Sequence, residues 1–149
     1  ERLVWAEGTE LCLTLDGASY YNTLRDCTFY KVGVGIESRG LCNDTRIYGG
    51  RIYSQACGVK MLVPSHCWLF SGVSFEGSGP RDGTIGPHLI LEGEDHTIGN
   101  GWRFERGGSR KYNPAAVVFG ESTENCKIDR GVRRVYGFSV SDYGVKNSY

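Results

Sequence analysis

The sequence has little of what builds helices, membrane spans or basic nucleic-acid surfaces. Alanine occurs five times and methionine once in 149 residues, so strong helix formers are scarce and we expect almost no helix. No apolar run approaches the roughly 20 residues that span a bilayer, and the first ten residues lack the layout of a signal peptide. Seventeen basic residues balance seventeen acidic ones. This balance argues against nucleic acid as a partner, and the lack of apolar runs argues against membrane insertion.

Signatures of metal, nucleotide and nucleophile chemistry are also missing. No CxxC pair, P-loop, GxSxG elbow or HExxH motif occurs. The six cysteines could form a disulfide framework, but such frameworks are typical of short secreted chains with small cores. We therefore predict buried free thiols, no metal and no cofactor.

Glycine, by contrast, is abundant, at 22 of 149 residues, and the apolar positions are filled by aromatic and β-branched side chains that strands prefer. The length favours one domain that spans residues 1–149. Because the chain does not begin with methionine, we expect it to be a fragment of a longer chain.

An internal repeat organises these residues. Segments such as DTRIYGGRI and CWLFSGVSF place an apolar residue about two positions before Gly, Asn or Asp, at intervals of 23, 22, 29 and 30 residues. These leading residues are Leu24, Ile47, Leu69, Ile98 and Ile128. A second apolar row follows five or six positions later: Phe29, Ile52, Phe75 and Phe104. A third row consists of alternating pairs: Val34/Ile36, Val59/Met61, Leu89/Leu91, Val117/Phe119 and Phe138/Val140.

A polar row lies three positions before the leading residues and consists of Tyr21, Asp44, His66, Asp95 and Asn125. Three short strands in about 22 residues, with no helix between them, predict a solenoid in which equal positions stack about 4.8 Å apart. Polar residues then occupy corners where φ is positive. A β-sandwich is the rival fold, but it does not explain three rows that repeat in register.

Segments such as NDTRIYGGRIYSQACGVKM and NCKIDRGVRRVYGFSV resemble turns of the right-handed parallel β-helix of the pectin-lyase-like superfamily and of phage tailspikes. The resemblance covers roughly residues 9–142 and implies an all-β solenoid of about five to six turns. It implies little about activity, because the group includes lyases, hydrolases and adhesins without catalysis. No calcium-binding aspartate cluster or paired-aspartate motif of its enzymes is present.

Two adjacent turns carry about seven extra residues between the second and third rows, at the same corner. Stacked loops of this kind form a wall beside a sheet, and binding residues often lie on such loops. The insertions lie within residues 77–88 and 107–115. Their candidate substrate-binding residues are Arg81, Asp82, Arg110 and Tyr112.

An outward row of Tyr30, Tyr53, Glu76 and Glu105 follows the second core row directly. If the register holds, Glu76 and Glu105 lie one strand apart, a spacing that suits the two carboxylates of a retaining glycosidase. An ion-pair ladder with the flanking Arg51 and Arg103 is the commoner alternative, and ligand contact without chemistry is a third.

The outward row and its flanking arginines also offer contacts for a sugar, whereas a row of cysteine and histidine does not form a metal site. Tyr30 and Tyr53 could stack on sugar rings, and Arg51 and Arg103 could contact acidic or hydroxyl groups. Cys67, His96 and Cys126 share one row, but cysteines two turns apart are too distant to share a zinc ion, so we interpret this row as corner packing.

An acidic group lies near the end of the third row and comprises Glu92, Glu94, Asp95, His96, Glu121 and Glu124. It predicts either a solvated acidic edge or a site for a hard cation. Glu94 and Glu124 both fall four positions before a leading isoleucine, so we expect them to stack across one turn.

Three functions fit the sequence: a tailspike-like depolymerase of surface polysaccharide, a glycan-binding adhesin, or a structural shaft. The paired insertions favour the first two. The resemblance implies a virion or extracellular location and a homotrimer, in which the open ends of a short solenoid would be covered.

Overall fold

A computed structural model describes residues 10–77, 86–99, 104, 115–129 and 139–149 with side chains, and residues 4–5, 103, 105–106 and 133–134 as backbone. Across these residues every regular element is a strand, and all strand pairs are parallel. The fold is therefore all-β with parallel sheets, as the scarcity of helix formers predicts.

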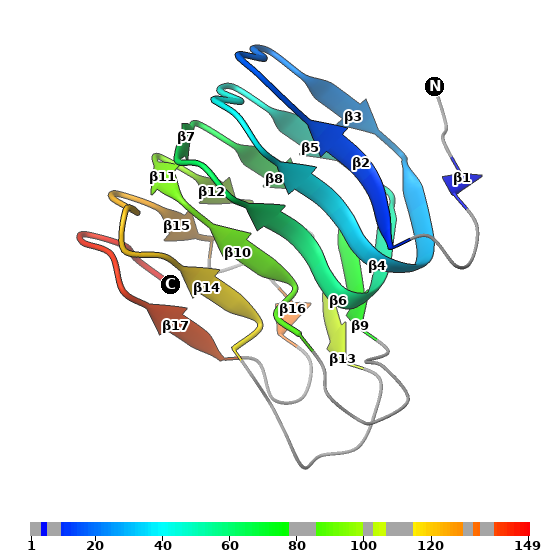
Figure 1. The fold of residues 1–149 in the computed structure, drawn as a ribbon. Helices are drawn as coiled ribbons and strands as arrows, with labels where there is room; N and C mark the ends of the chain where they lie inside the picture. The colour runs from blue at the N-terminus through cyan, green and yellow to red at the C-terminus, as the bar shows by residue number, and fades with distance from the viewer. Residues whose placement is uncertain are drawn as a thin grey trace.

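Each repeat contributes strands to the same sheets. The leading row forms a five-stranded sheet of β3 (Thr23–Arg25), β5 (Arg46–Tyr48), β8 (Leu69–Ser71), β12 (Thr97–Ile98) and β15 (Lys127–Ile128). A two-stranded sheet pairs β7 (Ser65–His66) with β11 (Gly93–Glu94). Figure 1 shows the strands of successive repeats stacked side by side along the molecule.

The second and third rows belong to one ten-stranded sheet, because the two longest strands run through both rows. These are β4 (Thr28–Ser38) and β6 (Arg51–Met61), each 11 residues long. The second row continues through β9 (Ser74–Gly77), β13 (Arg103–Arg106) and β16 (Arg133–Arg134). The third row continues through β10 (Leu89–Leu91), β14 (Val117–Phe119) and β17 (Val140–Asp142). The strands β1 (Val4–Trp5) and β2 (Leu11–Leu15) pair with β4.

The second core row is confirmed. Phe29 pairs with Ile52, Ile52 with Phe75 and Phe75 with Phe104, and each is at most 1% exposed. The Phe75 and Phe104 rings stack with centroids 5.4 Å apart. A Cβ atom at Gly58 would come within 2.8 Å of the Phe75 ring, so this corner needs glycine for the ring to fit.

The leading row is correct except at Leu69, where the prediction is wrong. Phe70 pairs with Ile47 and Ile98 and is fully buried, whereas Leu69 is partly exposed and pairs with Arg46 and Thr97. A shift of one residue exchanges the two faces of a strand. The signal was present, because Phe70 stands two residues before Gly72 as Ile47 stands before Gly49.

The polar corner carries the same one-residue error. Positive φ angles occur at Tyr21, Asp44, Asp95 and Asn125 as predicted, but in the third repeat at Cys67 (φ 57°) and not at His66. Cys67 is exposed, so the predicted row of Cys67, His96 and Cys126 is also wrong. Trp68 takes the inward place and is fully buried.

The third row is confirmed in the described residues, and the structure fixes which members of the alternating pairs lie side by side. Ile36 pairs with Val59, Val59 with Leu89 and Leu89 with Val117, while Val34 pairs with Cys57. At the other end Val140 pairs with Val117, and Phe138 lies outside the described residues. An alternating pattern repeats every two residues, so the pattern alone cannot fix its phase along the strand.

Candidate functional site

The predicted outward row lies in register on the outer face of the ten-stranded sheet. Tyr30 pairs with Tyr53, Tyr53 with Glu76, and the backbone of Glu76 with that of Glu105. The rings of Tyr30 and Tyr53 stack with centroids 5.2 Å apart and planes 30° apart. Tyr30 is 41% exposed. The Lys31 ammonium lies 5.5 Å from the Tyr30 ring centroid and adds positive charge to this surface.

Glu76 ends this described row in an ion pair. The Arg51 Nε donates to Glu76 Oε1 at 2.9 Å, and the Ser74 hydroxyl donates to the same oxygen at 3.3 Å. Arg51 and Ser74 are themselves register partners on neighbouring strands. The Glu76 side chain is 16% exposed and that of Arg51 50%. We call the surface of Tyr30, Tyr53, Arg51 and Glu76 the tyrosine surface.

The remaining predicted site residues are only partly placed. The Arg103 backbone pairs with Ser74, and the side chains of Arg103 and Glu105 lie outside the described residues. The candidate loop residues Arg81, Asp82, Arg110 and Tyr112 also lie outside them. The insertions fall between β9 and β10 and between β13 and β14, which is the same position in successive repeats.

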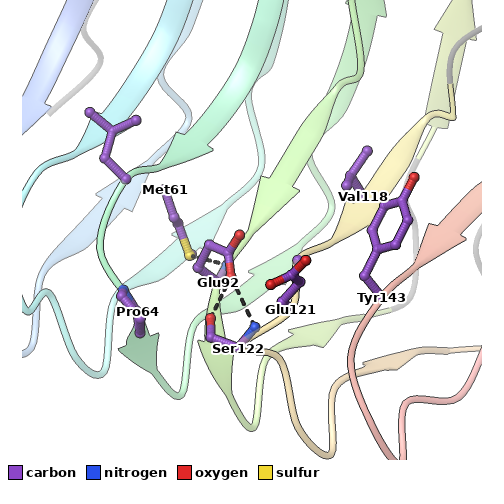
Figure 2. Close-up of a pocket in the computed structure, with 9 residues that line it drawn as sticks. Met61, Pro64, Glu92, Val118, Glu121, Ser122 and Tyr143 are labelled. Atoms are coloured by element: carbon purple, nitrogen blue, oxygen red, sulfur yellow. Dashed lines mark hydrogen bonds between the residues drawn. The ribbon is translucent and has the colours of Figure 1, made fainter.

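A pocket of about 630 Å³ lies at the carboxyl ends of β6, β10, β14 and β17. Sequence patterns did not predict it. Its apolar wall is formed by Met61, Leu62, Pro64 and Val118. Its polar lining residues are Glu92, Glu121, Ser122 and Tyr143. Figure 2 shows the carboxyl groups of Glu92 and Glu121 facing the same space, with the Tyr143 ring beyond Glu121.

Neighbouring residues fix the Glu92 side chain in this pocket. The Ser122 hydroxyl donates to Glu92 Oε2, and the Ser122 N–H donates to the same oxygen at 3.3 Å. The Ser122 hydroxyl also accepts from Gly93 N–H at 3.0 Å. A Cβ atom at Gly120 would lie 1.8 Å from Glu92 Oε1, so the carboxylate occupies space that only glycine leaves open.

Beneath the pocket, a buried histidine holds the backbone of Glu92. His96 is 1% exposed, its Nε2 lies 2.9 Å from the Glu92 carbonyl, and its Nδ1 lies 3.2 Å from Trp68 N. Because the Trp68 N–H donates, Nδ1 accepts and Nε2 carries the ring proton. Burial lowers the pKa of His96 from 6.5 to about 4, since the charged form would lose its solvation.

The cysteines have structural roles. All six are free, and Cys27, Cys42, Cys57 and Cys126 are buried as predicted. Burial raises the pKa of the Cys57 thiol to about 12, which keeps it protonated and unreactive. Cys67 departs from the prediction because its corner position exposes it.

The acidic edge pairs as predicted. Glu94 and Glu124 form a parallel bridge between neighbouring repeats. Glu124 accepts from Lys146 Nζ at 2.5 Å, and His66 Nδ1 lies 3.7 Å from Glu94 Oε2. No group of three or more histidine, cysteine, aspartate or glutamate residues in the described part of the chain is arranged to hold a metal ion.

Comparisons with known proteins found no match that could indicate a function, so the functional argument uses the geometry alone. No protein-family model matches the chain, and no curated protein or solved structure does either. In the described residues, no helix has the length and apolar character needed to cross a membrane.

Proposed function

We propose that the chain is a tailspike-like module of a right-handed parallel β-helix, of about five to six turns, that binds a cell-surface polysaccharide. Parallel pairing of equal positions in successive repeats supports the coil. Connections between neighbouring parallel strands are right-handed in nearly all proteins, which supports its hand.

The observation that carries the binding proposal is the tyrosine surface. Tyr30 and Tyr53 present stacked aromatic faces on a rigid sheet, beside the Arg51–Glu76 ion pair. Tyrosine rings offer an apolar face with a polar tip, which suits the faces and hydroxyl groups of a sugar ring. Arg51 can exchange part of its contact with Glu76 for an acidic or hydroxyl group of the glycan.

Affinity electrophoresis through gels that contain hyaluronate, polygalacturonate or dextran tests this proposal. We expect at least one polysaccharide to retard the protein, and Tyr53→Ala to weaken the binding about tenfold, or roughly 1.4 kcal/mol. Tyr20→Ala is the matched control, because Tyr20 is 52% exposed and lies outside the tyrosine surface. Equal retardation of both variants would contradict the proposed site.

A second candidate function is depolymerisation by Glu76 and Glu105, and the backbone register that pairs them favours it. One carboxyl would act as the acid and the other as nucleophile or base. Glu76→Gln and Glu105→Gln should each reduce cleavage at least about 100-fold while binding persists. If these variants lose binding and the wild type cleaves no polysaccharide, the protein is an adhesin without catalysis.

A further inference from the structure

We propose that the pocket beside Glu92 binds an organic ammonium group carried on a small body, such as the free amine of an amino sugar or a short alkylamine. This site is separate from the tyrosine surface, since it lies at the ends of β10, β14 and β17. It does not depend on the proposed polysaccharide binding.

The first argument is uncompensated charge. Glu92 and Glu121 both line the pocket, and none of its lining residues is lysine, arginine or histidine. The carboxylates of Glu37, Glu76 and Glu124 each have a basic partner within 4 Å. Among the described residues, neither Glu92 nor Glu121 forms such a pair. The pocket therefore favours a cation.

The second argument is that the carboxylate is already positioned. Ser122 donates two hydrogen bonds to Glu92 Oε2, while Oε1 receives none from a described residue and lies over Gly120. Register places Gly120 between Glu92 and Tyr143, because Leu91 pairs with Phe119 and Phe119 with Asp142. The missing side chain at Gly120 therefore makes room for the Glu92 carboxylate, which fills that space between the strand ends. A positioned carboxylate loses little conformational freedom when a donor binds.

The third argument selects an organic cation over a metal ion. A hard cation such as Ca²⁺ takes six to eight oxygen ligands, whereas much of this pocket is apolar. Met61, Leu62 and Val118 offer contacts for carbon atoms, and Tyr143, 66% exposed, offers an aromatic face for an ammonium group. A volume of about 630 Å³ lies within the range of small-molecule sites.

Titrations followed by amide NMR spectra test the proposal with four probes. Glucosamine and n-butylammonium carry the ammonium group, and glucose and n-butanol are their neutral counterparts. We expect the two ammonium probes to shift the Gly120, Ser122 and Tyr143 amide signals with saturation at millimolar concentration, and the neutral probes to leave them unchanged. Tighter binding of glucosamine would identify an amino sugar, and tighter binding of n-butylammonium a simple amine.

Two variants locate the interaction. Glu92→Gln keeps the shape and removes the charge, so affinity for both ammonium probes should fall about tenfold or more. Glu94→Gln is the matched control, because Glu94 is two residues away and does not line the pocket. The same spectra show that each variant is folded. The proposal is wrong if neither ammonium probe shifts these signals, if the neutral probes bind equally well, or if Glu92→Gln binds like the wild type.

Discussion

Glu76 and Glu92 lie on two regions of the same ten-stranded sheet and its strand ends, and they differ in how their charge is balanced. Glu76 lies on the tyrosine surface and is paired with Arg51 on the neighbouring strand. Glu92 directly follows β10 and accepts hydrogen bonds from Ser122. It has no basic partner among the described residues. The first arrangement balances its own charge and offers a flat, mixed surface. The second leaves a negative, partly apolar hollow that favours a cation.

Both surfaces lie on the ten-stranded sheet, and the leading row packs its own buried residues in the five-stranded sheet of the same repeats. Phe70 is fully buried in the ladder, whereas its neighbour Leu69 faces outward. Phe70→Ala should destabilise the fold by about 3–5 kcal/mol, and Leu69→Ala by less than about 1 kcal/mol. Urea unfolding measures both. Equal losses, or a larger loss at Leu69, would contradict the register of the leading row.

Acid should affect the pocket region through His96, which binds the Glu92 carbonyl. The pKa of His96 is about 4 in the fold and near 6.5 when unfolded, so the unfolded chain binds the extra proton between these values. The contribution of the neutral ring is complete above pH 6.5. It decreases by about 3 kcal/mol as the pH falls toward 4.

Unfolding of the wild type and His96→Gln between pH 7 and 4 measures this contribution, since other acidic groups titrate in both proteins. The stability difference between them should shrink as the pH falls. A constant difference for His96→Gln would contradict the role assigned to its burial.

A change at Gly120 should affect the pocket and not the tyrosine surface, because Gly120 lines only the pocket. Gly120→Ala would place Cβ 1.8 Å from Glu92 Oε1 and force that side chain to move. We expect a loss of less than about 1 kcal/mol, because the displaced atoms are the end of a flexible and partly exposed side chain, together with weaker binding of the ammonium probes. Retention of dextran or hyaluronate at the tyrosine surface should not change. Altered polysaccharide retention would show that the two surfaces are coupled.

The smallest expected effect concerns the ion pair of the tyrosine surface. Arg51 is half exposed, so solvent screens its attraction to Glu76. A double-mutant cycle with Arg51→Met and Glu76→Gln should give a coupling free energy of at most about 1 kcal/mol. A much larger coupling would indicate that the pair serves stability more than ligand contact.

The sequence predicted the ladders well because inward positions recur at nearly constant intervals. Phe29, Ile52, Phe75 and Phe104 follow the leading row by five or six residues in each repeat, and the structure places them together. The prediction failed at Leu69 because two large apolar residues stand side by side there and either could face the core. Spacing from Gly72 decides between them, because Phe70 stands two residues before Gly72 as Ile47 stands before Gly49.

The pocket was not predicted because its residues share no pattern. Leu62, Ser122 and Tyr143 come from different turns, and periodicity does not reveal which outward residues surround an empty space. The acidic cluster that includes Glu92 and Glu121 predicts a solvated edge or a metal site, and does not by itself indicate a pocket. The sequence offers one signal for the pocket, which is Gly120. It follows Phe119 of the third row, whereas the equivalent position of the preceding repeat, after Leu91, is Glu92.

Disulfide trapping tests most directly whether Glu76 and Glu105 stand side by side on the outward face, as the proposed depolymerisation and the register of the outward row require. Adjacent strands lie about 4.8 Å apart, within reach of a disulfide, whereas Tyr30 and Glu105 are three strands apart, or roughly 14 Å. The account predicts that oxidation of the Glu76→Cys/Glu105→Cys variant joins these two positions in the monomer, as non-reducing peptide mapping would show, and that Tyr30→Cys/Glu105→Cys forms no such bond. Failure of the first pair to join, or ready joining of the second, would contradict the register.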